Sequence, residues 1–161
     1  MDQTKIKYYY EANVDMVYKL SFTYMKNKAD AEDVVQEVFL RLVKHLEKLE
    51  SDEHVKAWLI VTTTNYCKSQ LTHWWNKRIE IDENHESAQT YLEDDGQSNV
   101  LEAVMSLPMK LKTPIYLYYY EGYTSGEISI ILGKPAGTIR SYLHQGRLKL
   151  KKLLQEGDSD L

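Results

Sequence analysis

The stretch Thr124–Arg147, with the sequence TSGEISIILGKPAGTIRSYLHQGR, combines two helix patterns separated by a tight turn. Thr124 followed three residues later by Glu127 is the signature of a capping box, which begins a helix. Gly133 would end that helix, and Pro135-Ala136 would open a second, longer one that runs to Leu154. A short helix, a tight turn and a long helix predict a helix-turn-helix.

The longer helix is amphipathic. Five positions recur at steps of 4, 3, 4 and 3 and predict its buried face: Ile139, Leu143, Gly146, Leu150 and Leu153. Four polar residues then face outward: Arg140, Ser141, His144 and Arg147. A helix that reads the major groove needs this arrangement, with base contacts from its first turns and phosphate contacts from later cations. Glycine inside a helix costs about 1 kcal/mol relative to alanine, and a close approach of another helix would explain it at residue 146.

Individual roles follow from side-chain chemistry. Arg140 can donate two hydrogen bonds to guanine, a pairing that contributes about 1–3 kcal/mol of discrimination. Thr138 and Ser141 can bond a phosphate or a base edge. The cations suited to phosphates, with salt-dependent affinity, are Lys134, Arg147 and Lys151. The alternative is that this charged face is only a solvated surface.

The charge distribution favours a nucleic-acid partner although the formal net charge is −4. Residues 98–155 hold 8 basic and 3 acidic groups, whereas residues 79–97 hold 7 acidic groups and no Lys or Arg. Residues 1–78 are nearly balanced, with 12 basic and 11 acidic groups. Acid is therefore concentrated away from the basic helix-turn-helix, and the total charge averages this asymmetry away.

Three further helices are expected in the first half, and short loops between them would make a compact bundle. The first would bury Tyr10, Val14, Val17, Ser21 and Tyr24. The second would begin at an Asp30 N-cap, with Asp33 completing a variant capping box. Its apolar stripe comprises Ala31, Val35, Val38, Phe39, Leu42, Leu46 and Leu49. The third, capped by Ser51 or Asp52, would bury Val55, Trp58, Leu59, Thr62 and Tyr66.

Residues 79–97 lack periodicity and are acidic, which is typical of a self-repelling flexible linker. Beyond them, Ser98 would cap a short helix that Pro108 stops, and Thr113-Pro114 would begin a helix that ends at Gly122. The expected fold is all-α, with two small helical domains, 1–78 and 98–161, joined by the linker 79–97. The second domain carries the helix-turn-helix.

Several classes of protein are disfavoured by composition. No apolar run approaches the roughly 20 residues that cross a bilayer, and residues 1–10 lack a signal-peptide core, so we expect a cytoplasmic protein without membrane insertion. Cys67 is the one cysteine, which excludes an internal disulfide and favours a buried, inert thiol. The five histidines form no metal-binding motif and no nucleophile motif occurs, so no catalytic residue, metal or cofactor is expected.

Two blocks of sequence resemble the extracytoplasmic-function (ECF) type of RNA polymerase sigma factor. Residues 107–147, including Leu107-Pro108, the capping box and Gly137-Thr-Ile-Arg-Ser-Tyr-Leu-His144, resemble domain 4 of that family. Residues 29–41, with the sequence ADAEDVVQEVFLR, resemble the polymerase-binding helix of domain 2. The motif Ala57-Trp-Leu59 with Asn65 resembles the following helix. The resemblance covers about residues 8–78 and 98–155.

The resemblance implies core RNA polymerase as a partner, through its β′ coiled coil and β flap, together with promoter DNA. The positions that match the β′-binding surface are Asp30, Glu32, Asp33, Gln36, Glu37, Phe39 and Arg41. Acid and amide groups beside an apolar strip suit a basic partner helix. For Asp30 and Asp33, helix capping alone is an alternative role. The sequence leaves open whether an anti-sigma factor also binds.

The resemblance further implies that the first domain reads the melted −10 element and the second the −35 duplex. The −10 candidates are Lys56, Asn65, Lys68, Trp74, Lys77 and Arg78. The −35 candidates are Lys134, Thr138, Arg140, Ser141, Tyr142, His144, Arg147 and Lys151. Trp58 is expected in the core, while Trp74 and Trp75 fit a core or a DNA contact equally. The loop from Glu47 to His54, where the family places its base pocket, is acidic here and unsuited to phosphates.

Three departures from the family pattern concern the second domain: Lys112 in place of arginine, Gly126 in place of glutamate, and Tyr142 and Gln145-Gly146 in place of more basic residues. They leave the −35 sequence undefined. Three other functions remain open: a stand-alone helix-turn-helix regulator that binds operator DNA without polymerase, an adaptor that binds polymerase but reads no DNA, and an enzyme.

Overall fold

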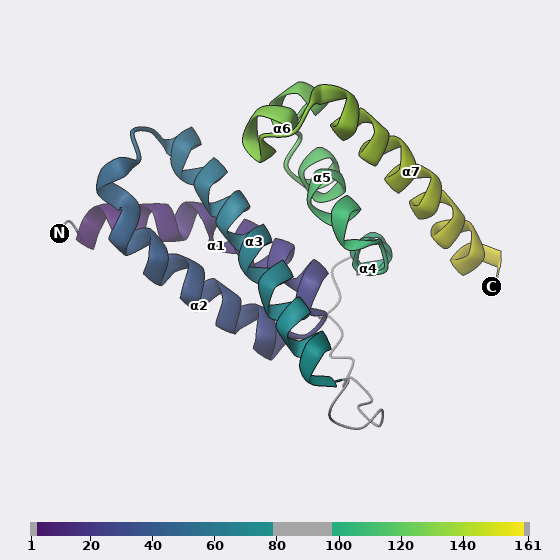
Figure 1. Ribbon diagram of the computed structural model, residues 1–161, viewed down its shortest axis with the longest axis horizontal. Helices are drawn as coiled ribbons and strands as arrows, with labels where there is room; N and C mark the ends of the chain where they lie inside the picture. Colours follow the sequence, from purple (N-terminus) through teal and green to yellow (C-terminus); the bar gives the residue numbers. More distant parts are fainter. Residues whose placement is uncertain (1–2, 79–97, 160–161) are drawn as a thin grey trace. The chain divides into compact units, whose positions relative to one another are not determined.

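The computed structural model describes residues 3–78 and 98–159 and divides into two compact units. Throughout these residues the secondary structure is helical, with no strand (Figure 1). The expected all-α fold is thus confirmed. The boundary between the units falls inside residues 79–97, the expected linker, which lie outside the described residues.

The first unit packs three helices, α1 (Gln3–Met25), α2 (Lys28–His45) and α3 (Asp52–Arg78), with a 3-10 turn η1 (Leu46–Lys48) before α3 (Figure 1). Every pair among the three helices is in contact. Side chains without solvent exposure at the centre include Val17, Leu20, Val38, Leu42 and Leu59. The seven residues of the predicted stripe are all buried, but only the five from Ala31 to Leu42 lie on α2, because Leu46 begins η1 and Leu49 follows it.

The start of α2 was predicted wrongly. The N-cap is Asn27, whose Oδ1 accepts a hydrogen bond from the Asp30 backbone N–H at 2.8 Å. Asp30 is the third helical residue and accepts in return from Asn27 Nδ2 at 2.6 Å. Asp33 lies one turn further along the helix and is exposed. The reason is local: α1 ends at Met25 and Lys26, directly after it, adopts a left-handed φ of 67°, so the next helix starts as soon as the chain turns.

The buried faces of α1 and α3 are rotated from those predicted. On α1, Tyr9 and Asn13 are buried while Tyr10 is 44% exposed and Val14 is half-buried. On α3, Val55 and Leu59 are buried as expected, but Trp58, Thr62 and Tyr66 are only half-buried. The buried positions there include Ile60, Thr63 and Cys67. Both helices pack on two neighbours, which widens the buried face and admits small or polar side chains that hydrophobic periodicity ignores.

The second unit contains α4 (Ser98–Met105), α5 (Met109–Tyr120), α6 (Ser125–Leu132) and α7 (Ala136–Ser159). The long α7 packs on the other three helices (Figure 1). The core of this unit includes Leu111, Ile115, Ile128, Ile139 and Leu143. Because α4 begins at Ser98, its capping residue lies outside the described residues.

The start of α5 also differs from the prediction. The helix begins at Met109, directly after Pro108, and Pro114 lies inside it instead of at its first position. Proline in a helix interior removes one backbone hydrogen bond. All residues from Leu111 to Leu117 are buried, and this burial offsets the loss. The predicted terminator Gly122 is confirmed by its left-handed φ of 73° and the Tyr123 N–H to Leu117 O hydrogen bond at 3.1 Å.

Candidate nucleic-acid interface

The capping box that begins α6 is complete. Thr124 Oγ1 accepts from the Glu127 N–H at 3.1 Å, and Glu127 Oε1 accepts from the Thr124 N–H at 3.0 Å. The hydrogen bond from the Thr124 backbone, followed by that from its side chain, lowers the pKa of Glu127 from its usual 4.5. The start of the helix-turn-helix is therefore fixed by residues three positions apart.

The turn between α6 and α7 is fixed by two backbone carbonyls. Gly133 has a left-handed φ of 64°, and its N–H donates to Ser129 O, as does the Lys134 N–H at 3.1 Å. The Ser129 hydroxyl donates to Lys134 O at 2.5 Å. These bonds hold α7 in a fixed direction relative to α6, as a helix-turn-helix requires.

The predicted faces of α7 are largely confirmed. Ile139, Leu143, Gly146 and Leu150 are buried. The side chains expected to face outward are all exposed: Arg140, Ser141, His144 and Arg147, which we call the outer stripe. Lys134 and Lys151 are exposed as well. Leu153, expected inside, is 36% exposed, so the buried face ends one turn earlier than predicted.

Two predicted −35 residues are less accessible than the outer stripe. Thr138 and Tyr142 are half-buried, and the Lys110 ammonium of α5 lies 5.8 Å from the centre of the Tyr142 ring. A second cation of this kind is Arg147, whose guanidinium carbon lies 5.3 Å from the centre of the Tyr118 ring. No local sequence pattern predicts either pair, because their members lie about 30 residues apart.

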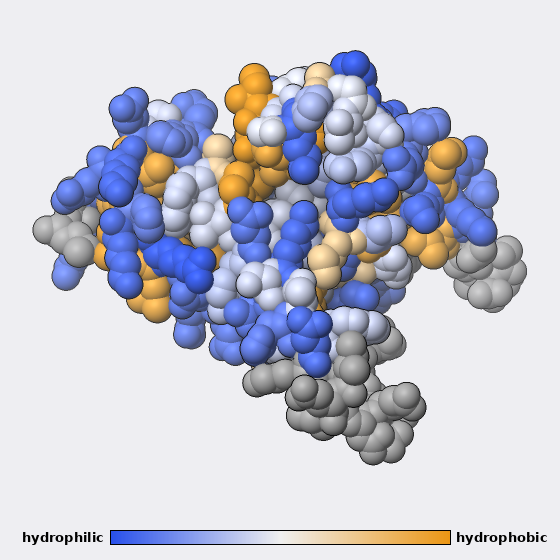
Figure 2. Space-filling model, in the orientation of Figure 1, coloured by the Kyte–Doolittle hydropathy of each residue, from blue (hydrophilic) through white to orange (hydrophobic). Residues whose placement is uncertain are grey.

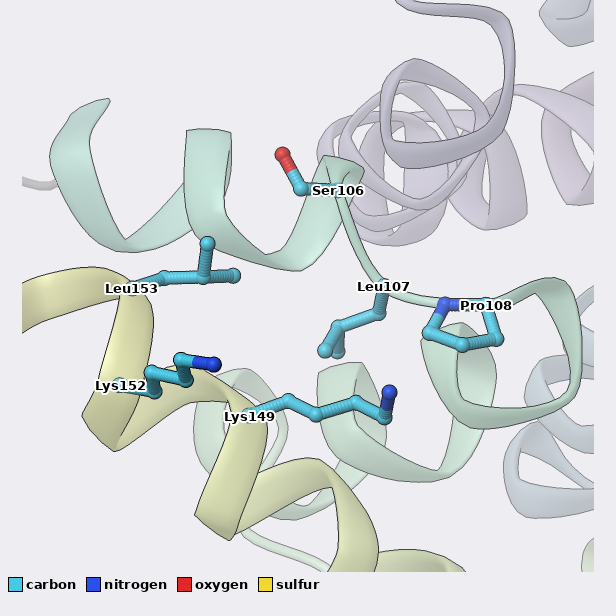
Figure 3. Close-up of a pocket in the computed structure, with 6 residues that line it drawn as sticks. All are labelled: Ser106, Leu107, Pro108, Lys149, Lys152 and Leu153. Atoms are coloured by element: carbon cyan, nitrogen blue, oxygen red, sulfur yellow. The ribbon is translucent and has the colours of Figure 1, made fainter.

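The crossing of α5 and α7 sets the outer stripe's direction. A Cβ placed on Gly146 would lie 2.4 Å from Cδ1 and Cγ1 of Ile115, so only glycine fits the present spacing. This confirms the expected close helix approach at residue 146. Away from the crossing, Ser106, Leu107 and Pro108 form an open hollow with Lys149, Lys152 and Leu153 of α7 (Figure 3). Figure 3 shows that both lysine side chains start from α7, about one helical turn apart.

In the first unit, α2 presents most of the predicted polymerase-binding residues. Glu32, Asp33 and Gln36 are exposed, and Asp30 is half-buried in its capping contacts. Glu37 Oε1 accepts from Arg41 Nε at 2.9 Å, and the Arg41 guanidinium lies 4.8 Å from the centre of the Tyr66 ring of α3. The pKa of Tyr66 is raised, mainly by burial of the ring and also by the nearby negative charge of Glu37.

Phe39, which was predicted to bind polymerase, and its neighbour Leu40, which was not, differ sharply in solvent exposure. Phe39 is 7% exposed and packs edge-on against Tyr10, with ring centres 4.9 Å apart, so it is a core residue more than a contact surface. The next residue, Leu40, is 61% exposed among the acidic and amide side chains of α2. Leu40 is therefore an exposed apolar side chain on this part of α2 that the sequence analysis did not single out.

The −10 candidates lie along α3 with unequal exposure. Asn65 is exposed, whereas Lys56 and Lys68 are half-buried. Trp74 is half-buried and Trp75 is 67% exposed, so the structure separates two tryptophans that the sequence could not. Lys77 and Arg78 end α3, but their side chains lie outside the described residues. Trp58 packs against His45, with ring centres 5.3 Å apart.

The loop before α3 is held by local hydrogen bonds and by α1. Ser51 Oγ accepts from the His54 N–H at 3.1 Å, which identifies Ser51 as the cap of α3. The Glu50 N–H donates to His54 Nδ1 at 3.3 Å. Tyr8 OH donates to Asp52 Oδ2 at 2.9 Å, and this bond raises the Tyr8 pKa. Side-chain hydrogen bonds therefore connect this loop both to the first turn of α3 and to α1.

The described residues contain neither a membrane-spanning helix nor a cluster of metal ligands. No helix among residues 3–78 and 98–159 is long and apolar enough to cross a membrane. Within the same part of the chain, no cluster of three or more His, Cys, Asp or Glu side chains is arranged to hold a metal ion. Cys67 is fully buried, as predicted.

Comparison with known proteins matches both units to one family. Sigma-70 region 2 matches residues 9–78 and Sigma-70 region 4 matches residues 97–150. The RNA polymerase sigma factor SigV of Bacillus subtilis is 32% identical over 143 residues, which cover 84% of this chain and 82% of SigV. The ECF RNA polymerase sigma factor SigE of Mycolicibacterium smegmatis is 28% identical over 157 residues, and this chain spans 61% of its length.

Two solved structures share the fold. The sigma factor RpoE of Bartonella quintana, in complex with the anti-sigma factor NepR, superposes with a TM-score of 0.79 at 20% identity, covering 94% of this chain and 97% of RpoE. CnrH, in complex with the cytosolic domain of CnrY, gives a TM-score of 0.68 at 16% identity, covering 96% and 90%.

A capped helix-turn-helix with an exposed polar stripe, following a three-helix unit with an acidic face, defines a helical DNA-binding transcription factor. With both region matches and the 32% identity to SigV, the chain belongs to the sigma-70 family, as an ECF-type member. It therefore serves promoter-specific transcription initiation with RNA polymerase. The resemblance seen in the sequence is confirmed.

Proposed function

We propose that the chain binds core RNA polymerase through α2, contacts the melted −10 element through α3 and reads the −35 duplex through α7. The carrying observation is the outer stripe, where Arg140, Ser141, His144 and Arg147 are exposed while their neighbours Ile139 and Leu143 are buried. A recognition helix needs this division to enter the major groove.

The residues of α7 and of the turn before it fall into two groups, those suited to base edges and those suited to phosphates. Arg140 and Ser141, in the second turn, face base edges, with Thr138 and His144 beside them. The phosphate contacts are Lys134, Arg147 and Lys151, whose exposed charges release counterions when DNA binds. Tyr142 is half-buried under Lys110 and is better suited to support a cation than to touch a base.

On α2, the exposed Glu32, Asp33 and Gln36 lie within about two turns before the exposed apolar side chain of Leu40. We assign this surface, with Glu37 and Arg41 at its edge, to the β′ coiled coil. Charged groups of this kind steer association, while a central apolar side chain supplies affinity. Asp30 serves the cap and Phe39 the core, so both support the surface from below.

On α3, the proposed −10 surface comprises Lys56, Asn65, Lys68, Trp74, Lys77 and Arg78. Trp75 belongs to the same surface because it is the more exposed tryptophan, and an exposed ring offers a face on which an unpaired base can stack. The acidic loop that Tyr8 and Ser51 hold in place is expected to bind by shape and hydrogen bonds, since Glu50, Asp52 and Glu53 repel phosphates.

We propose two further partners, the β flap of the polymerase for the second unit and an anti-sigma protein for the chain as a whole. The β flap would seat in the hollow of Leu107, Pro108, Lys149, Lys152 and Leu153, which lies apart from the outer stripe and offers apolar side chains beside two cations. An anti-sigma partner is proposed because RpoE and CnrH were both solved with protein partners, NepR and CnrY. We propose no catalytic role, and we place the protein in the cytoplasm because its polymerase partner works there.

Run-off transcription tests the proposal, with core polymerase and a promoter library, with and without the chain. New start sites should depend on the chain. Arg140→Ala should relax selectivity near −35 by about 1–3 kcal/mol, while Asp33→Ala or Gln36→Ala should weaken polymerase capture. Identical transcripts from wild type and all three variants would refute the proposal. An adaptor would keep full function with Arg140→Glu, and a stand-alone regulator would bind specific DNA without polymerase.

A further inference from the structure

Two cation–aromatic pairs join α5 to α7 beside the outer stripe. The Arg147 guanidinium carbon lies 5.3 Å from the centre of the Tyr118 ring, and the Lys110 ammonium lies 5.8 Å from the centre of the Tyr142 ring. Both distances are within the roughly 6 Å over which a ring face attracts a cation. In each pair one member comes from α5 and the other from α7.

The two pairs lie on opposite flanks of α7. Tyr142 precedes the buried Leu143 by one residue, and Arg147 follows the buried Gly146 by one residue. Each residue turns a helix by about 100°, so these two side chains leave opposite edges of the buried face. The crossing of Gly146 with Ile115 lies between them. One cation is therefore held at each side of the helix.

Both cations are open to a ligand. Lys110 and Arg147 are exposed, whereas Tyr142 is half-buried and Tyr118 is 36% exposed and braced edge-on by Tyr119, with ring centres 5.2 Å apart. Among the side chains that the structure describes, neither cation belongs to an ion pair. A free lysine or arginine side chain carries about 2 kcal/mol of rotamer entropy. A ring that already restricts this side chain reduces the conformational entropy that is lost when a ligand binds.

We propose that Lys110 and Arg147 bind phosphates of the two DNA strands that border the groove entered by α7, and that Tyr142 and Tyr118 are their positioning residues. A helix in the major groove has one phosphate backbone along each flank, which matches the two held cations. The proposal rests on the −35 function proposed above. It adds Lys110, from outside the helix-turn-helix, as a DNA contact and gives Tyr142 a supporting role.

The experiment uses holoenzyme reconstituted from core polymerase and the full chain, with a promoter duplex, at several KCl concentrations. Lys110→Gln and Arg147→Gln should each reduce the slope of log affinity against log salt by about 1, and the double variant by about 2. Both changes should weaken binding equally on promoters with intact and scrambled −35 sequences. An unchanged slope for Lys110→Gln would overturn its assignment.

The tyrosines are tested by coupling. Tyr118→Leu should weaken binding about two- to fivefold, the equivalent of an exposed cation–aromatic contact, while Tyr118→Phe should bind like wild type. In the Arg147→Gln background Tyr118→Leu should cost nothing more, yet in the Lys110→Gln background it should keep its full effect. Tyr142→Leu should show the reverse dependence. Tyr118→Phe, which keeps the ring face, is the matched control.

These experiments distinguish a failure of the proposed −35 function from a failure of the proposed role of the tyrosines. If wild-type holoenzyme fails to bind the promoter specifically, the proposed function fails. If wild type binds but Tyr118→Leu loses the same affinity with and without Arg147, the tyrosine is only structural and the present inference is wrong while the function stands.

Discussion

Gly146 of α7 and Ile115 of α5 meet so closely that a Cβ at residue 146 would lie 2.4 Å from Cδ1 and Cγ1 of Ile115. This single approach fixes the rotation of α7, because the residues on either side of Gly146 can then face only outward or along the flanks. The helix accepts an unfavourable residue in its interior, at about 1 kcal/mol, in return for the close packing.

Gly146→Ala should destabilise the second unit although alanine favours helices. The added methyl overlaps Ile115, and overpacking of this kind typically costs about 1–3 kcal/mol, more than the helix propensity gained. Thermal or urea unfolding followed by circular dichroism measures the change. Gly137→Ala is the matched control, because a Cβ there meets only Arg140 Nη2 at 3.8 Å, and it should be neutral or stabilising. Equal stability of Gly146→Ala and wild type would contradict the packing argument.

The capping box of α6 should make stability depend on acid pH. The hydrogen bonds from Thr124 lower the folded-state pKa of Glu127 below its usual 4.5, so the folded state favours the carboxylate. This stabilisation is fully present above pH 4.5 and is lost as pH falls through the lowered pKa. Unfolding of wild type and Glu127→Gln, followed between pH 3 and 7, should show a difference that shrinks on acidification. A constant difference would exclude this linkage.

The cap of α2 is expected at Asn27, not at the acid residues further on. Asn27→Ala should cost about 1 kcal/mol, since the Asp30 N–H would lose its acceptor, whereas Asn27→Ser, whose hydroxyl can accept the same hydrogen bond, should retain most of the stability. Asp33→Ala should leave stability unchanged because Asp33 is exposed and lies beyond the cap. Urea denaturation of the three variants gives the comparison. A larger loss from Asp33→Ala than from Asn27→Ala would restore the sequence-based assignment.

Leu40 should contribute to polymerase capture and not to stability. Its side chain is 61% exposed, so Leu40→Ala removes little buried surface from the free protein but about 1–2 kcal/mol of apolar contact from a complex. Titration of labelled chain with core polymerase, without DNA, measures the affinity. Leu148→Ala, at a 57% exposed leucine of α7, is the control and should bind polymerase normally. Equal affinities for both variants would remove Leu40 from the interface.

Local signals in the sequence were sufficient for the helix-turn-helix. The partners in the Thr124–Glu127 capping box and in the Gly133 turn lie within five residues of each other, and the buried face of α7 follows from helical periodicity alone. Family resemblance extended this to both units. The same approach misplaced the start of α5, since Thr113-Pro114 looks like a helix start but lies among seven buried residues.

The amino-acid sequence by itself thus determined an all-helical chain, its helix-turn-helix and the outer stripe, because these depend on hydrogen bonds and periodicity between near neighbours. Only the tertiary structure decided that Leu40 and Trp75 are exposed, that Phe39 is buried, and that Tyr118 and Tyr142 hold cations beside α7. Those properties depend on where helices cross, and the crossing of Ile115 with Gly146 joins residues 31 positions apart through shape complementarity that no local pattern encodes.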